Sequence, residues 1–377
     1  MKTTISLITV ICFSCLVQCQ NEKNQTFKLI IGSYTGSNLN EGISVYDFDS
    51  RTGDFNFKSK TPGVENPSYL AISPDGKYVY SVNEVRNGGI SAFVFKSPTD
   101  ELMLLNRVSS GGRGPCYVSV DKKNKFVFAG HFGGGSVSAI PLQEDGSLGS
   151  AIQTIQQYGS SIDKSIQQGP HIHATVLSPD NHFLLTANLG TDEIYIYKFN
   201  PSVATQPLTP ASPPLVSVKP GIGPRHIVFH PNSKFAYVVN EMGASITAFD
   251  YKDGRLNEIQ TITMLPSGYT GAVEAADIHV SPDGRFLYGS NRGDANDITI
   301  YAIMKNGKLS YAGRQSTLGI SPRDFDIDPT GNFVLAANMS TNEVVIFRRD
   351  KKTGLLTPTG KKIQVSRPAC LKFIIVD

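Results

Sequence analysis

Alternating hydrophobic and polar positions follow a tight turn at six places along the chain. They read as β-strands with one buried face, each after a turn rich in Pro, Asp, Asn and Gly, as in SPDGKYVYSVNE from Ser73. An aromatic residue opens all six strands: Tyr78, Phe126, Phe183, Phe235, Phe286 and Phe333. Their successive spacings of 48, 57, 52, 51 and 47 residues match the size of one four-stranded propeller blade.

A second set of strand-like segments lies just before the turns, and Pro opens most of its members. There are seven: NPSYLAIS from Asn66, GPCYVSV from Gly114, GPHIHATVLS from Gly169, GPRHIVFH from Gly223, EAADIHVS from Glu274, SPRDFDID from Ser321 and RPACLKFIIVD from Arg367. The last has no turn after it, whereas FKLIIGSYTG from Phe27 has no first strand before it. Joining both ends in one blade removes open sheet edges. The pattern predicts an all-β, seven-bladed propeller over residues 27–377, closed by a composite blade.

Two segments interrupt the even spacing of the repeat. One is the polar stretch from Gln153 to Gly169, and the other is the Pro-rich PSVATQPLTPASPP from Pro201. Both lie between the third strand of one blade and the first strand of the next. We therefore expect them to form long outer loops, not linkers between domains.

The N-terminus has the features of an export signal. Residues 1–18 carry one charge, Lys2, and an apolar stretch that is too short to span a membrane. LVQC, which ends at Cys19, resembles a bacterial lipoprotein processing box, although Gln18 replaces the usual small residue. We expect a signal peptide over 1–18, a tether over 19–26 and an exported protein, periplasmic or anchored to a membrane by a lipid on Cys19. Secretion without a lipid is the alternative.

Composition narrows the choice of partners. With 35 Lys plus Arg against 32 Asp plus Glu, the net charge is only +3, so we expect no nucleic-acid partner. We expect a monomer that acts on a small molecule. Cys116 and Cys370 fall on first strands one blade apart, which favours two free thiols over a disulfide.

Propeller geometry gathers ionisable side chains at one mouth of the ring. The entrance of each first strand and the exit of each second strand share one rim. Ten side chains at these places are candidate site residues: Glu84, His131, His171, His173, Arg225, His226, Glu241, Asp277, Arg292 and Arg323. For His171, packing within a strand is an equal alternative. The Asn at the exits of five second strands repeats with the blades, which favours a structural hydrogen bond over ligand binding.

Strand pleating limits which of these side chains share a face. His171 and His173 are two residues apart and are expected to share one face. Arg225 and His226 are consecutive, so a regular strand directs only one of them to the channel.

The runs GPRHIVFHPNSKFAYVVNE, AADIHVSPDGRFLYGSNR and GPHIHATVLSPD resemble the bacterial seven-bladed 6-phosphogluconolactonase family, whose relatives include fungal muconate cycloisomerases. The resemblance spans essentially Phe27 to Asp377. It implies hydrolysis of a sugar lactone, in the family 6-phosphogluconolactone. Carried over by position, it implies that His173, Arg225, Glu241 and Arg292 form the catalytic cluster.

These residue types suit lactone hydrolysis. Glu241, alone or with His173, could act as general base or acid, while Arg225 and Arg292 could hold an anion and stabilise an oxyanion. The remaining six candidates are expected to bind substrate, and the scheme requires no metal or cofactor. A metal site at His171 and His173 with Glu241 or Asp277 is an alternative, although no zinc-type spacing supports it.

Two further readings of the function stay open. One is a non-catalytic exported module that binds acidic sugars, and the other is a muconate-type cycloisomerase. The carboxylate of Glu241 beside two arginines favours catalysis, because a receptor for anions gains little from it.

Overall fold

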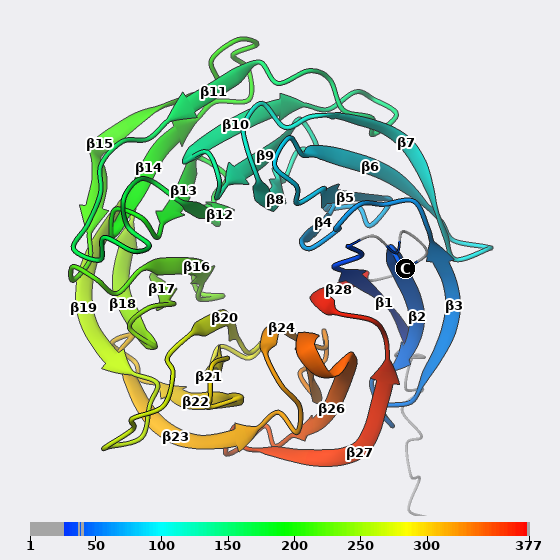
Figure 1. The fold of residues 1–377 in the computed structure, drawn as a ribbon, viewed down its shortest axis with the longest axis vertical. Coiled ribbons are helices and arrows are strands. Elements are labelled where there is room, and N and C mark those ends of the chain that lie inside the picture. Colours follow the sequence, from blue (N-terminus) through cyan, green and yellow to red (C-terminus); the bar gives the residue numbers. More distant parts are fainter. Residues whose placement is uncertain (1–25, 37, 39–40, 375–377) are drawn as a thin grey trace, which may run out of the picture.

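The computed structural model describes residues 26–36, 38 and 41–374. Their strands form seven four-stranded antiparallel sheets, arranged as blades around one axis (Figure 1). One sheet has the order β28-β1-β2-β3 and so joins both ends of the chain. The predicted seven-bladed propeller with a composite blade is confirmed. The predicted signal peptide and residues 19–25 of the predicted tether lie outside the described residues.

The two inner strands of each blade carry the repeat found in the sequence. The innermost strands are β4 (Leu70–Ile72), β8 (Pro115–Val120), β12 (Ile172–Leu177), β16 (Pro224–Phe229), β20 (Ala275–Val280), β24 (Pro322–Ile327) and β28 (Pro368–Ile374). The second strands are β1 (Thr26–Ser33), β5 (Tyr78–Val82), β9 (Phe126–His131), β13 (Phe183–Asn188), β17 (Phe235–Asn240), β21 (Phe286–Asn291) and β25 (Phe333–Asn338). Each of the six predicted aromatics is the first residue of its second strand.

The two outer strands complete each blade. The third strands are β2 (Ile43–Asp49), β6 (Gly89–Lys96), β10 (Ser136–Pro141), β14 (Glu193–Phe199), β18 (Ser245–Lys252), β22 (Asp297–Ile303) and β26 (Glu343–Arg349). The outermost are β3 (Phe55–Thr61), β7 (Glu101–Ser109), β11 (Gln153–Gln156), β15 (Leu208–Ser217), β19 (Arg255–Thr263), β23 (Leu309–Ser316) and β27 (Leu356–Gln364). A short 3-10 helix, η1, spans Met339–Thr341.

The expectation that two segments are only outer loops is wrong, because each contains a fourth strand. The stretch from Gln153 begins with β11, and the Pro-rich segment contains most of β15. Both are edge strands with one unpaired side. Proline is tolerated there because an edge strand does not need all of its N–H groups in the ladder.

Neighbouring blades interlock through the repeated aromatic and a glycine of the next blade. A Cβ at Gly307 would lie 2.3 Å from the Phe235 ring, and the Tyr237 hydroxyl donates to the Gly307 carbonyl at 3.0 Å. The same ring-to-glycine contact recurs at Tyr78/Gly146, Phe183/Gly254, Phe286/Gly354 and Phe333/Gly53. The conformation of Gly307, with φ +77°, also favours glycine. This contact therefore explains five of the six recurring aromatics, whereas Phe126 packs edge-on against Phe199 of the next blade, with centroids 5.8 Å apart.

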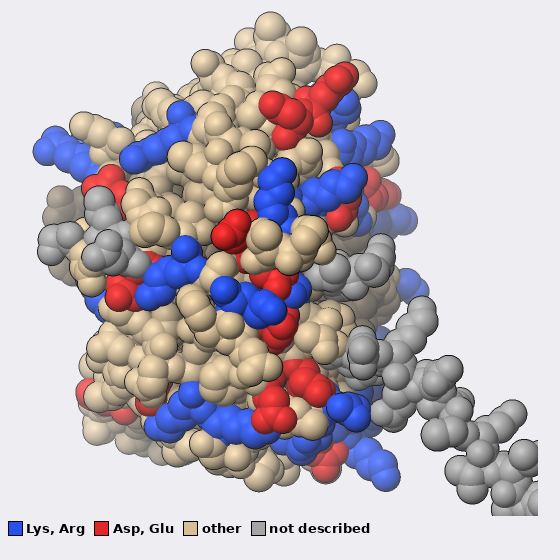
Figure 2. Space-filling view, turned by 90° about the vertical axis from the view of Figure 1, so that its right-hand side faces the viewer, with Lys and Arg blue, Asp and Glu red and all other residues tan. Residues whose placement is uncertain are grey.

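The surface carries both signs of charge. Figure 2 shows Lys and Arg interleaved with Asp and Glu on the side of the molecule that β3 and β7 form. In the part of the chain that the structure describes, no helix has the length and apolar character needed to cross a membrane. Cys116 and Cys370 are buried free thiols, as the one-blade separation predicted.

Candidate active site at the propeller mouth

Irregular pairing at the start of the innermost strands shapes the mouth. The register shifts after Pro224 in β16, and similar shifts occur near the starts of β8, β12, β20 and β24. A bulge of this kind breaks the alternation of side chains. Arg225 Nη1 donates to His226 Nε2 at 3.0 Å, and both residues are buried inside the ring. The expectation that only one of them faces the channel is therefore wrong.

Two arginines converge on one oxygen of Glu241. Arg225 Nε lies 2.8 Å and Arg292 Nη2 lies 3.1 Å from Glu241 Oε2. Arg292 Nη1 also pairs with Glu274 Oε1 at 3.1 Å. The Glu241 side chain is about 20% exposed, whereas the Arg225 side chain is 2% exposed. Glu241 and Glu274, whose side chain is 45% exposed, are thus the members of this cluster that are open to the mouth, whereas the two arginines lie beneath them.

Backbone hydrogen bonds fix this cluster across two blades. The Glu241 N–H donates to the Gly223 carbonyl at 2.7 Å, and the Ala275 N–H donates to the Glu241 carbonyl at 3.0 Å. The Arg225 guanidinium also donates to the Ala276 carbonyl. Burial lowers the pKa of Arg292 to about 10, with Arg225 and Arg323 adding to the effect and Glu241 opposing it. Arg292 remains a cation at neutral pH.

Asp192 holds the loop that leads into β16. Its Oδ1 accepts the Gly223 N–H at 2.7 Å, and its Oδ2 accepts the Gly221 N–H at 2.6 Å and Gln167 Nε2 at 2.8 Å. Gly223 has φ +63°, and its carbonyl receives the Glu241 N–H. Asp192 therefore supports both Arg225 and Glu241 through one glycine, a role that no sequence motif indicated.

His173 and His226 are both neutral side chains in the interior of the channel. Burial and then Arg225 lower the pKa of His226 to about 3, although Asp277 opposes this shift. Burial, Arg225 and His226 hold the pKa of His173 well below its usual range. The two rings lie 5.2 Å apart, and His173 Nδ1 is buried without a hydrogen-bond partner among the described residues. His173 is therefore a neutral ring with one nitrogen that has no hydrogen-bond partner among the described residues.

Asp277 completes this part of the site from the next blade. Its Oδ1 accepts a hydrogen bond from His226 Nδ1 at 2.7 Å. Below the pair, Tyr69 and Tyr117 stack with their centroids 4.0 Å apart, and both rings meet the His226 ring edge-on. Both tyrosines also line a hollow that is formed by the far ends of the innermost strands, so they lie between His226 and that hollow.

Arg323 and Glu84 lie on the composite-blade side of the mouth. Arg323 Nη2 is 3.8 Å from Glu84 Oε2, and the guanidinium lies over the Tyr34 ring at 5.1 Å. The Tyr34 hydroxyl donates to Glu84 Oε2 at 2.6 Å, and Ser68 donates to the same oxygen. Sequence reasoning missed Tyr34. It follows β1, at the exit of the second strand in the composite blade, so aligning that blade with the others would have found it.

His171 and His131 are not brought to Glu241. His171 Nδ1 lies 2.7 Å from the Phe132 carbonyl and Nε2 lies 3.1 Å from the Ile166 carbonyl, while its ring stacks on Phe132. These contacts tie the loop before β12 to the end of β9. His131 is fully buried, and its Nδ1 lies 2.9 Å from the Ser136 carbonyl. In the structure both histidines therefore brace the backbone.

The repeating asparagines also have structural partners, as predicted. Asn291 Nδ2 donates to Asp297 Oδ1 at 2.7 Å, and Asn240 Nδ2 donates to Thr247 Oγ1 at 3.0 Å. Both contacts join the exit of a second strand to the third strand of the same blade.

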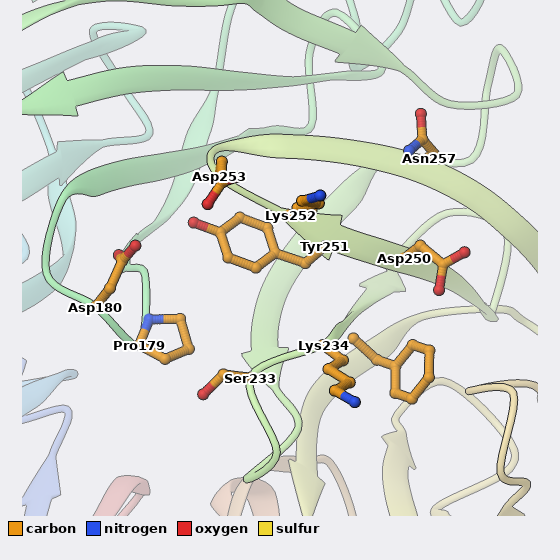
Figure 3. Close-up of a pocket in the computed structure, with 10 residues that line it drawn as sticks. Pro179, Asp180, Ser233, Lys234, Asp250, Tyr251, Lys252, Asp253 and Asn257 are labelled. Carbon is orange, nitrogen blue, oxygen red and sulfur yellow. The ribbon is translucent and has the colours of Figure 1, made fainter.

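The described residues also contain a hollow away from this mouth. A pocket of about 740 Å³ lies between the turns after β12 and β16 and the β18–β19 hairpin. Figure 3 shows the Tyr251 hydroxyl between Asp253 and Asp180 in this pocket. These turns follow the ends of β12 and β16, whereas Arg225 lies at the start of β16. No three His, Cys, Asp or Glu side chains in the described ranges are grouped as a metal site.

Comparison with known proteins identifies the family. The model of the lactonase, 7-bladed beta-propeller family matches residues 28–373. The chain belongs to this lactonase family. A 6-phosphogluconolactonase of Formosa agariphila is 37% identical over 350 residues, which cover 92% of this chain and 99% of the relative. A 6-phosphogluconolactonase of Bacillus subtilis is 35% identical, covering 91% of this chain and 97% of the relative.

A solved structure supports the membership in the lactonase family. The periplasmic gluconolactonase of Pseudomonas aeruginosa has a TM-score of 0.88 to this chain at 33% identity. The match covers 93% of this chain and 100% of that protein. The resemblance to 6-phosphogluconolactonases inferred from the sequence is confirmed at the level of the family.

Proposed function

We propose that the protein is a lactone hydrolase, a carboxylic ester hydrolase that opens sugar lactones such as 6-phospho-D-glucono-1,5-lactone to the hydroxy acid. The observation that carries the proposal is the arrangement of Glu241. Arg225 and Arg292 both contact Oε2, and Oε1 has no hydrogen bond or ion pair with the described residues. A carboxylate held in this way keeps one oxygen for proton transfer. Relatives with lactonase names, similar over nearly their whole length, support the same assignment.

The reaction can be assigned to these side chains. Glu241 Oε1 takes a proton from water as the water oxygen bonds to the lactone carbonyl carbon. The carbonyl electron pair moves to oxygen, and Arg225 Nη2, which has no hydrogen bond or ion pair with the described residues, donates to this oxyanion. The bond to the ring oxygen then breaks, and Glu241 returns the proton to that oxygen. The products are a hydroxyl group and a carboxylic acid, which releases its proton to solvent and becomes a carboxylate.

Arg323 is the proposed anchor for an anionic group of the substrate. It makes no hydrogen bond with the described residues, and Glu84 is its one ion-pair partner there, at 3.8 Å. A guanidinium with free donors suits a phosphate or carboxylate. We propose that Glu84 positions Arg323. His226 and Asp277 are proposed to position Arg225. His171 and His131 would affect binding through the backbone they brace.

The place of action is a further part of the proposal. The leader-like residues 1–18 and LVQC before the tether support export, with a lipid on Cys19 as the anchor, followed by the catalytic domain from residue 27. The Pseudomonas aeruginosa relative is named a periplasmic gluconolactonase, which agrees with export. An exported enzyme would meet lactones without phosphate more readily than a phosphorylated metabolite. We propose that the protein acts as a monomer.

The test is a direct assay of ring opening. Hydrolysis of δ-gluconolactone and of its 6-phospho form is followed by acid release and corrected for spontaneous opening. The proposal expects catalysed hydrolysis of at least one lactone. No catalysis with a folded protein would contradict it, and conversion of a muconate to a lactone would instead favour the ring-closing reaction of the fungal cycloisomerases.

A further inference from the structure

A series of polar contacts continues beyond the catalytic cluster and joins three neighbouring blades. It runs from Arg225 through His226 to Asp277, with donor and acceptor 3.0 and 2.7 Å apart. Asp277 Oδ2 is then 3.0 Å from His279 Nε2, and His279 Nδ1 is 3.7 Å from Asp326 Oδ1. All of these residues lie on β16, β20 and β24, and the other four blades contribute none to this series of contacts.

The contacts on both sides of His226 determine where its proton lies. A guanidinium can only donate, so His226 Nε2 must accept from Arg225 Nη1. The neutral ring then carries its proton on Nδ1, where Asp277 Oδ1 accepts it. With the other tautomer, an N–H on Nε2 would face the N–H of Arg225. The carboxylate of Asp277 therefore keeps His226 able to hold Arg225.

Burial makes this preference strong. His226 is 4% exposed and Asp277 is 2% exposed, so an unpaired Nδ1–H would not find water in place of Asp277. Burial alone would raise the pKa of Asp277, but His279 and the hydrogen bonds from His226 and His279 hold it well below its usual range. Asp277 is thus a carboxylate, which can accept from both rings.

The charged groups around His279 and Asp277 come from three neighbouring strands. Asp324 and Asp326 lie on β24, Lys372 lies on β28 and His226 lies on β16. Asp326 and Lys372 line a hollow of about 390 Å³ at the opposite mouth, together with Tyr69 and Tyr117. The contacts that run from Asp277 through His279 to Asp326 are therefore directed to the opposite mouth, away from the substrate.

We propose that Asp277 is a positioning residue for the hydrolysis: it fixes the His226 proton on Nδ1 and so holds the Arg225 guanidinium against Glu241. His279 supports Asp277 from the other side through Oδ2. The inference rests on the proposed function for its effect on catalysis. It assigns to His226 the role of a hydrogen-bond acceptor for Arg225, not that of a general base.

Two substitutions at Asp277 distinguish the effect of its hydrogen-bond acceptor from the effect of its negative charge. Asp277→Asn keeps an oxygen that can accept from His226 Nδ1, and its amide can donate to His279 Nε2. Asp277→Leu keeps the branched shape of the side chain, with a larger volume, and has no acceptor. Asp324→Leu is the matched control, because Asp324 is 1% exposed and accepts the Leu371 N–H but has no hydrogen bond or ion pair with His226 among the described residues.

The readouts are kcat, KM and the imidazole nitrogen spectrum of ¹⁵N-histidine-labelled protein. We expect Asp277→Leu to lower kcat about 100-fold with little change in KM, because a small misplacement of a catalytic group has this effect. The His226 signals should lose the Nδ1–H pattern. Asp277→Asn should keep that pattern and most of the activity, and Asp324→Leu should keep both.

Several results would overturn the inference. They are an unchanged tautomer and kcat in Asp277→Leu, an equal loss of kcat in Asp324→Leu, or a proton on His226 Nε2 in the unsubstituted protein. The last measurement decides even if Asp277→Leu does not fold. If the unsubstituted protein opens no lactone, the proposed function fails, and the tautomer spectra still test whether Asp277 positions His226.

Discussion

Arg225 donates from Nη1 to Nε2 of the next residue in the chain, His226, at 3.0 Å. Consecutive residues of a regular strand point to opposite faces, and the bulge after Pro224 is what brings these two together. The bulge therefore doubles the number of side chains that β16 contributes to the mouth. It lets one strand supply a group that faces Glu241 and a second group that orients the first.

Arg323 should determine whether a phosphorylated lactone is preferred. Its guanidinium has free donors at the mouth, so Arg323→Gln should raise KM for the 6-phospho lactone about 10-fold, the effect of one charge-assisted contact. KM for δ-gluconolactone should change less than about 2-fold, since it has no anionic group. Steady-state kinetics with both lactones measure the difference.

Arg367→Gln is the matched control for this experiment. The Arg367 guanidinium also lies over the Tyr34 ring, at 5.3 Å, but Arg367 is exposed. A similar rise in KM for both arginine variants, or a rise with both lactones, would show that Arg323 does not select the phosphate.

His279 should make stability depend on pH in a defined direction. Burial alone would lower its pKa, but Asp277 and Asp326 raise the pKa above the ordinary 6.5. A histidine with a raised folded pKa contributes all of its stability below about pH 6.5 and loses it as pH rises through the folded pKa. Urea unfolding should therefore show that His279→Gln costs more stability at pH 5.5 than at pH 9.

The opposite sign would contradict this assignment. His226, whose pKa is lowered to about 3, is the internal comparison. The stability that a buried neutral histidine contributes to the folded protein is lost as pH falls below about 6.5. If His279→Gln lowers the free energy of unfolding equally at both pH values, the contact between His279 and Asp277 does not depend on charge.

Asp192 should matter for stability as well as for activity. Asp192→Asn places an amide donor near the Gly221 or Gly223 N–H, both of which now donate to the carboxylate. Leaving one buried donor unpaired costs about 1–3 kcal/mol. We expect a lower Tm together with a lower kcat, measured by thermal unfolding and lactone hydrolysis.

Asp297→Asn is a suitable comparison for Asp192→Asn. Asp297 is also a buried carboxylate, held by Asn291 and Arg314 of its own blade. A loss of Tm in both variants but a loss of kcat only in Asp192→Asn would confirm the link through Gly223. Unchanged kcat in a folded Asp192→Asn protein would remove that link.

The repeat made the ring predictable from the sequence. The aromatic that opens a second strand fills the space over a glycine of the next blade in five blades, as Phe235 does over Gly307. A requirement imposed five times leaves a visible period. The outermost strands β11 and β15 were missed because an edge strand needs neither regular alternation nor an unbroken set of N–H donors.

The sequence located the residues of the candidate site better than it predicted the contacts between their side chains. Arg225, Glu241 and Arg292 stand at rim positions that the repeat locates, and the structure brings them into contact. The contact between Arg225 and His226 depends on a bulge that leaves no mark in the sequence. His171 was expected to bind substrate, but both of its ring nitrogens face backbone carbonyls.

The most direct test of the account compares Glu241→Gln with Glu274→Gln. Both carboxylates pair with Arg292 at 3.1 Å, but only Glu241 also contacts Arg225. We expect Glu241→Gln to lower kcat for lactone hydrolysis about 1000-fold, within the range of general acid–base catalysis, with Tm nearly unchanged. Glu274→Gln should retain most of the activity. Equal activities of the two variants, or unfolding of Glu241→Gln alone, would contradict a catalytic role for Glu241.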